Sequence, residues 1–259
     1  MRNARTTAMA AGLPLVGLTL VLLAWEAAAR LAANATLVPP PLVVGRAFIG
    51  MLDGDLPADI GASLVHLSIG YSLGVISGLI LALIAAGSRR LEAVIDPLVE
   101  FLRPISPIAW IPLAILFFGV GRAVPVYLIF YAALFPIFVS TLDGIRRVDP
   151  RLVLAAASLG ASRALVVRAV VLPAALPSVI AGARLSLGVA WMSLVAGEIV
   201  GGDAGIGWRI LWYQEFFQMD HVLAAILVVG VLGLAADLVL RGVQALARRW
   251  NPAAAEGAT

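Results

Sequence analysis

The 259-residue sequence contains no lysine and no cysteine, and it has only two histidines. A P-loop needs a lysine that reaches the nucleotide phosphates, so this chain cannot hold that kind of ATP site. Without cysteine there is neither a disulfide framework nor thiolate chemistry. His66 and His221 lack the HExxH spacing of a zinc site, and we interpret both as polar residues at a membrane edge. We therefore expect no metal, no cofactor and no catalytic residue in this chain.

Charge is scarce as well. Charged residues make up 13% of the chain and hydrophobic residues 62%, with a mean hydropathy of +1.02. Such values lie outside the range of soluble domains. The apolar runs do not alternate, which favours helices over a barrel. Because a membrane-spanning helix needs roughly 20 apolar residues, we predict an all-α, polytopic bundle of about six transmembrane helices. They are expected at residues 13–33, 63–86, 94–118, 124–142, 174–200 and 222–245.

The arginines predict the orientation of the bundle, because basic residues are retained on the cytoplasmic side. With both termini inside, most of the eighteen arginines are cytoplasmic, and the exceptions are diluted by acidic residues. We expect a cytoplasmic N-terminus (1–12), a single transmembrane domain (13–249) and a disordered cytoplasmic tail (250–259). The small residues at 33–35 leave a removable signal peptide as an alternative for the first span. Since the charge lies at membrane edges, it indicates contact with lipid and no nucleic acid.

One pattern typical of enzymes occurs in the second predicted span. Residues 70–74 match G-x-S-x-G, with Ser72 as the candidate nucleophile and His66 as its base. A nucleophile elbow requires a strand and a sharp turn, whereas this segment lies in an apolar helical run. Gly70, Gly74 and Gly78 recur every four residues, which is typical of a small-residue stripe against another helix. An intramembrane serine hydrolase remains the remote alternative.

A polar passage, residues 149–173, lies between two membrane-grade runs within a predicted cytoplasmic loop at 143–173. Asp149 followed by Pro150 predicts a helix start. Gly160 can end that helix, Ser162 can cap a second one, and Pro173 is expected to terminate it. A face of mostly small side chains in the first helix predicts docking into a partner, with an amphipathic loop on the membrane surface as the alternative. That face comprises Val153, Ala156, Ala157 and Gly160.

This passage resembles the signature loop of the permease subunits of binding-protein-dependent ABC importers, EAA-x3-G-x9-I-x-LP. The matching positions in this sequence are Leu154, Ala155, Ala156, Gly160, Val170, Leu172 and Pro173. Leu154 stands where the family has glutamate, so packing is expected to replace a polar contact to the ATPase. The resemblance implies an ATPase-coupling site, which Asp149, Ala161, Ser162 and Arg163 complete.

The resemblance extends over nearly the whole chain and is strongest to the group that imports sulfonates, taurine, nitrate and related compounds. It is carried by residues 37–44, 88–121, 172–191 and 197–210. It implies a type I importer fold and a homodimer in the bacterial inner membrane. It also implies a pair of ATPase subunits on the cytoplasmic side and an extracytoplasmic solute-binding protein.

Candidate pathway residues lie mainly in the third predicted span, which Pro104, Pro107 and Pro112 should kink or break. Charged residues inside spans are functional candidates by default. Arg103 can instead pair with Glu100, Arg184 can extend to the surface, and Glu198 lies near the hydrated outer end of the fifth span. The tentative substrate pathway comprises Arg103, Pro104, Ser106, Pro107, Trp110, Arg184, Trp191 and Glu198.

A self-contained secondary transporter is the main alternative. Such a protein usually shows paired repeats with interrupted helices in both halves, and we find only one interrupted span. The glycine-punctuated stretch 201–221 is predicted to be a short interfacial helix or a face for the binding protein.

Overall fold

The computed structural model describes the backbone of residues 2–32 and 37–250, and the side chains of residues 16–32, 37–242 and 244–245. The side chains of Arg2 and Arg5, the small residues at 33–35 and the predicted tail after residue 250 lie outside these ranges. All regular secondary structure in the described part is helical. The elements are α1 (Arg2–Leu31), α2 (Pro41–Leu52), α3 (Leu56–Gly87), α4 (Arg89–Leu102), η1 (Pro107–Trp110), α5 (Ile111–Phe118), α6 (Ala123–Arg146), α7 (Pro150–Ser158), α8 (Arg163–Val166), η2 (Val167–Val171), α9 (Leu172–Gly201), α10 (Ile206–Glu215) and α11 (Met219–Trp250).

Four helical segments of the described chain are long and apolar enough to cross a membrane, or five if the bent pair of α4 with α5 counts as one span. They cover the predicted spans from the second to the sixth. The helix α1, with 30 residues, covers the first, although its side chains are described only from Val16 onward. The predicted all-α membrane bundle is confirmed.

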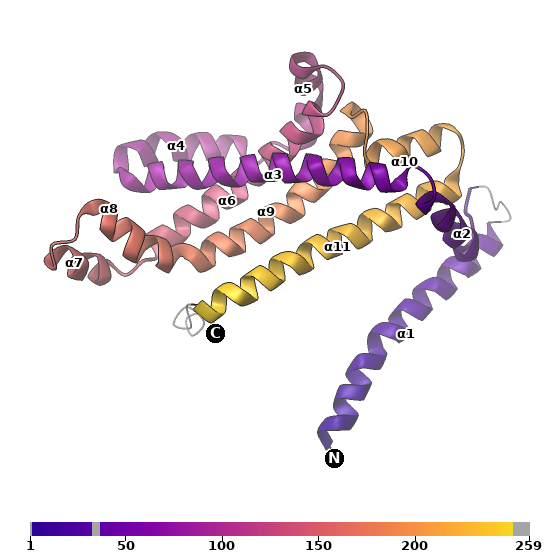
Figure 1. The fold of residues 1–259 in the computed structure, drawn as a ribbon, viewed down its shortest axis with the longest axis horizontal. Coiled ribbons are helices and arrows are strands. Elements are labelled where there is room, and N and C mark those ends of the chain that lie inside the picture. The colour runs from indigo at the N-terminus through magenta and orange to yellow at the C-terminus, as the bar shows by residue number, and fades with distance from the viewer. Residues whose placement is uncertain (1, 33–36, 251–259) are drawn as a thin grey trace. The chain divides into compact units, whose positions relative to one another are not determined.

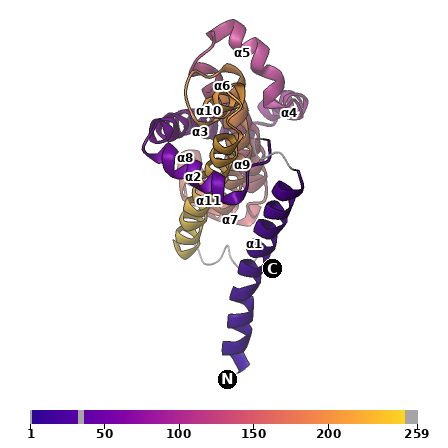
Figure 2. The ribbon, with the colours of Figure 1, turned by 90° about the vertical axis from the view of Figure 1, so that its right-hand side faces the viewer.

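The third predicted span is broken, as its prolines indicated. α4 ends at Leu102, and the next helices, η1 and α5, continue at an angle of 90° (Figures 1 and 2). Pro107 opens η1, and Pro112 lies in the first turn of α5, where the missing N–H costs no helical hydrogen bond. Residues 94–118 therefore form two helical segments at an angle, α4 and then η1 with α5, and not one continuous span.

The chain forms two compact units. Of the described residues, the first comprises 2–32, 37–58 and 209–229, and the second comprises 59–208 and 230–250. In the first unit, Trp25 donates from Nε1 to the carbonyl of Pro39 at 3.1 Å. Arg209 pairs with Asp55 at 3.1 Å and lies over the ring of Trp212, 5.6 Å from its centroid. The second unit contains the candidate site.

The core of the second unit is the antiparallel pair of α6 and α9, which run side by side in Figure 1. Glycines line their contact from end to end. A Cβ at Gly197 would stand 2.8 Å from Cα of Pro125, and one at Gly144 would stand 2.6 Å from Cβ of Ser178. The two backbones can therefore approach closely only because these positions lack a side chain.

The predicted glycine stripe of α3 is confirmed as a helix contact. Gly70, Gly74 and Gly78 all face α6. A Cβ at Gly74 would stand 2.7 Å from both Cβ of Ala133 and the carbonyl oxygen of Phe130. Because one neighbour is backbone, the contact cannot adjust by a side-chain rotation alone.

We expect Gly74→Ala to lower the free energy of unfolding by about 1–3 kcal/mol, because it overpacks this contact. Gly61→Ala is the matched control on the same helix, since no atom lies within 4 Å of its added Cβ. The control should be neutral or slightly stabilising, because alanine favours helix. The measurement is thermal unfolding in detergent, and equal midpoints for both variants would contradict close packing at Gly74.

Candidate functional site

The passage between α6 and α9 begins as its sequence indicated. The carboxylate of Asp149 caps α7 by accepting from the backbone N–H of Arg151 at 2.8 Å, and Pro150 is the first helical residue. At the other end, Gly160 adopts a φ of +81°. The N–H of Ala161 then donates to Ala156 at 3.1 Å, and the N–H of Gly160 donates to Ala157 at 3.0 Å. These two bonds form a Schellman motif, so Gly160 ends α7 as expected.

The second helix differs from the prediction. Ser162 does cap α8, since its hydroxyl accepts from the N–H of Leu165 at 3.3 Å. Pro173, however, does not end a helix, because it lies in the first turn of α9. The intervening residues Val167–Val171 form a π-helical turn. We attribute this turn to Pro173, which has no N–H to donate and whose ring crowds the preceding turn.

Most side chains of α7 are exposed. None of its residues is buried. The small-residue face that was predicted to dock into a partner is only partly exposed, because Val153 and Ala156 are half-buried. The free apolar surface is instead provided by leucines, with Leu154 65% exposed and Leu159 89% exposed. Figure 1 shows α7 and α8 at the end of the unit where α6 finishes and α9 begins.

The predicted pathway residues of the bend after α4 are mostly exposed. Arg103, Pro104 and Ser106 are exposed, while Pro107 and Trp110 are half-buried. The anticipated ion pair between Arg103 and Glu100 is not formed among the described residues, since both side chains point to the surface. Trp110 packs against Tyr131 of α6, with ring centroids 5.4 Å apart.

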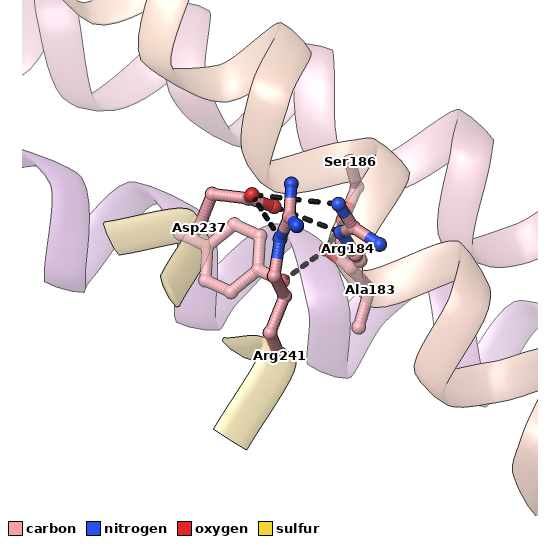
Figure 3. Close-up of polar contacts among 6 residues, drawn as sticks. Ala183, Arg184, Ser186, Asp237 and Arg241 are labelled. Carbon is pink, nitrogen blue, oxygen red and sulfur yellow. Dashed lines mark hydrogen bonds and ion pairs between the residues drawn. The ribbon is translucent and has the colours of Figure 1, made fainter. Parts of the chain in front are cut away.

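The other predicted pathway residues, Arg184, Trp191 and Glu198, are seven apart and share one face of α9. That face is a contact within the subunit. Arg184 donates from Nε to Asp237 of α11 at 2.8 Å, and Arg241 donates to the same carboxylate at 2.7 Å (Figure 3). Trp191 lies against Gly233 of α11, where an added Cβ would stand 2.8 Å from the indole Nε1. The expected extension of Arg184 to the surface is therefore replaced by an ion pair.

Beside this cluster, the hydroxyl of Tyr71 on α3 donates to the carbonyl of Ala183 at 2.5 Å. Two guanidinium groups share a single carboxylate here, which leaves the cluster with a net positive charge. The side chains of Arg184 and Asp237 are 38% and 31% exposed. Charged groups on apolar helices are thus neutralised in part and remain accessible from one side.

Glu198 differs most from expectation, because it is fully buried. Its Oε2 accepts from the hydroxyl of Ser63 and from the N–H of Gly207, each at 2.9 Å, and its Oε1 lies 2.9 Å from Nδ1 of His66. Ser63 in turn accepts from the N–H of Ile206 at 2.9 Å. His66 is therefore a buried partner of Glu198. A buried carboxylate persists when hydrogen bonds satisfy it in this way.

Sequence reasoning did not identify Ser63, His66 or Asp237 as partners of predicted site residues. Their separation in sequence from those residues explains this, since Ser63 and Glu198 are 135 residues apart. A signal for the Glu198 network was nevertheless present in the glycines that follow it. Gly205 has a φ of +108°, which favours glycine. A Cβ at Gly207 would stand 2.7 Å from Cβ of Glu198, so a larger residue there would collide with the glutamate.

The hydrolase alternative gains no support from the positions of its residues. His66 is buried against Glu198, whereas Ser72 is exposed on another side of α3. The two side chains are six residues apart on one helix and point in different directions.

The family described as the binding-protein-dependent transport system inner membrane component matches residues 74–249, a range that includes α6, the passage of α7 and α8, and α9. The chain belongs to this family. It is a transmembrane permease subunit of a transport system.

Two curated relatives cover most of the permease. It is 33% identical over 233 residues to the taurine transport system permease protein TauC of Escherichia coli (strain K12), covering 88% of this chain and 85% of that one. It is 34% identical over 253 residues to the bicarbonate transport system permease protein CmpB of Synechococcus elongatus (strain ATCC 33912 / PCC 7942 / FACHB-805), covering 92% and 88%.

The fold of the permease also resembles a solved transporter. The crystal structure of an amino acid ABC transporter with histidines matches with a TM-score of 0.62 and 19% sequence identity, covering 78% of this chain and 97% of that one. This likeness concerns the fold, and it agrees with the predicted type I importer architecture.

We expect Glu198→Ala to lower the free energy of unfolding by about 3–5 kcal/mol, because it leaves buried partners without an acceptor. Glu198→Gln should cost less, since its amide oxygen can still accept from Ser63 and from Gly207. Ser68→Ala is the control, because that exposed hydroxyl bonds only within its own helix, to Leu64. Thermal unfolding in detergent measures all three, and an alanine variant as stable as the wild type would contradict this account of the network.

Proposed function

We propose that the permease is the membrane subunit of an ATP-driven importer and that α7 and α8 form its contact with a separate ATPase. The observation that carries this proposal is the exposure of α7, which buries none of its residues and presents leucines to the surroundings. A two-turn helix without buried side chains gains little from its own chain. A partner that covers Leu154 and Leu159 supplies the missing burial.

The departure from the signature loop fits this contact. Leu154 replaces a glutamate, and its side chain is 65% exposed. Fully burying a leucine contributes about 1.5–3 kcal/mol, so apolar packing can compensate for the absent polar contact. The arginines Arg151, Arg163 and Arg168 of the same passage are also exposed and suit an acidic rim on the partner.

The proposed assembly contains two copies of the permease, two ATPase subunits and an extracytoplasmic solute-binding protein in a bacterial inner membrane. Membership of the family supports the ATPase and the binding protein. The arginine-rich passage between α6 and α9 supports a cytoplasmic position for α7 and α8, and hence cytoplasmic termini.

The proposed solute is a small oxyanion such as a sulfonate, taurine, nitrate or bicarbonate. The names of the relatives support this class, since one is a taurine and the other a bicarbonate permease. The net positive cluster at Arg184 and Arg241 also suits an anion more than a cation. The exposed residues of the bend, Arg103 and Ser106, remain candidates for the pathway wall.

The decisive experiment is reconstitution in liposomes with the cognate ATPase and solute-binding protein. We expect solute uptake that requires ATP and all three components, because the chain has no lysine for a P-loop of its own. Uptake is measured with labelled taurine or bicarbonate. Uptake by the permease alone, driven by an ion gradient, would instead support a secondary transporter.

We call residues 149–173 the coupling passage, and the turn at Gly160 between α7 and α8 its hinge. Substitution at Gly160 tests this hinge. We expect Gly160→Val to reduce ATP-driven uptake at least tenfold, because a β-branched residue opposes a φ of +81°. No atom of the chain lies within 4 Å of the added Cβ, so the effect arises from the backbone or from the partner. Asparagine tolerates this conformation, so Gly160→Asn separates the two causes.

If the backbone conformation matters, Gly160→Asn retains most of the uptake while Gly160→Val loses it. If contact with the ATPase matters, both variants lose uptake and capture less ATPase in a pull-down from detergent. Wild-type uptake by the valine variant would refute a role for the hinge.

A further inference from the structure

Arg146 connects three carboxylates at the point where the coupling passage leaves the membrane helices. It is the last residue of α6, and only three residues separate it from α7. Its Nε donates to Glu92 of α4 at 2.8 Å, and its terminal nitrogens reach Glu92, Asp96 at 3.1 Å and Asp143 at 3.9 Å. Glu92 and Asp96 are one turn apart on α4, so one guanidinium bridges both.

The short connection from Arg146 to α7 is itself ordered. The N–H of Arg147 donates to the backbone carbonyl of Asp143 at 3.1 Å, and the N–H of Val148 donates to the carbonyl of Ile145 at 3.2 Å. Asp149 then caps α7. A displacement of α7 therefore reaches Arg146 through a tight turn and not through a slack linker.

The far end of α4 is attached to α6 by different contacts. The hydroxyl of Tyr131 donates to the carbonyl of Leu102, the last residue of α4, at 2.7 Å. Val99 is buried in an apolar cluster with Tyr131 and Phe135. Immediately after Leu102 the chain bends by 90° into η1 and α5. The helix α4 thus spans the distance from Arg146 to the bend that carries Ser106 and Trp110.

We propose that Arg146 is a positioning residue that makes α4, and with it the bend at residues 103–110, follow the coupling passage during transport. This inference rests on the proposed function, since it assumes that the ATPase acts on α7 and α8. Without the guanidinium, Glu92, Asp96 and Asp143 repel one another across the contact between α4 and α6. The amino end of α4 then separates from α6, and ATP hydrolysis no longer moves the bend.

If Arg146 only stabilised the fold, its loss would mainly lower the thermal unfolding midpoint. The side chains of Arg146 and Glu92 are 44% and 29% exposed, and exposed ion pairs contribute little to global stability. Loss of Arg146 should therefore change the number of solute molecules transported per ATP hydrolysed far more than it changes the thermal unfolding midpoint.

The experiment compares Arg146→Gln, Arg146→Lys, Arg146→Glu and the charge exchange that combines Arg146→Glu with Glu92→Arg, in liposomes containing the ATPase and the binding protein. Uptake and ATP hydrolysis are measured together. Arg90→Gln is the matched control, because this exposed arginine lies on α4 near Glu92 and its side chain forms no ion pair or hydrogen bond in the described part of the chain.

We expect Arg146→Gln to reduce the ratio of uptake to hydrolysis at least tenfold with the unfolding midpoint nearly unchanged. Lysine should restore part of the ratio, since it keeps the charge but lacks the guanidinium fork. The charge exchange should restore more than the single change Arg146→Glu. A wild-type ratio in Arg146→Gln would overturn the inference, as would a loss that the charge exchange does not rescue. Absence of ATP-dependent uptake by the wild type would instead refute the proposed function.

Discussion

The close antiparallel contact between α6 and α9 is the constraint on which the rest of the second unit depends. Lipid is as apolar as the helix surfaces, so helices in a membrane associate through close packing and hydrogen bonds and not through the hydrophobic effect. Gly144 and Gly182 provide that closeness near one end, and Gly197 and Gly201 provide it near the other. Because both helices flank α7 and α8, the same contact sets the separation of the two attachment points of the coupling passage.

The two ends of this helix pair have opposite character. At the end of α9, Glu198 is buried and satisfied by two side chains of α3 and by the N–H of Gly207. Removing any partner leaves a polar group in an apolar setting, so this end resists rearrangement. At the other end, α7 buries nothing and the ion pairs of Arg146 are exposed. Rearrangement therefore costs least where a partner is proposed to bind.

Local features were predictable from the sequence, and long-range partners were not. The Asp149 cap, the helix end at Gly160 and the glycine stripe of α3 depend on residues within one or two turns, and all are confirmed. The burial of Glu198 and the pairing of Arg184 with Asp237 depend on which helices meet, and a single sequence does not contain that information. Pro173 is a local exception, because the π-helical turn at Val167–Val171 lets the helix continue and places the proline in the first turn of α9.

Helix α4 is the element best suited to move relative to the pair of α6 and α9. Sliding α6 against α9 would drive side chains into backbone at each glycine, so these two helices move together. Near the bend, by contrast, α4 is held by an apolar cluster and the hydrogen bond from Tyr131 to Leu102. At its other end it is held by exposed charges, which can exchange partners with water at modest cost. A displacement delivered at Arg146 therefore tilts α4 about its contact with Tyr131 and changes the direction of the broken segment that follows.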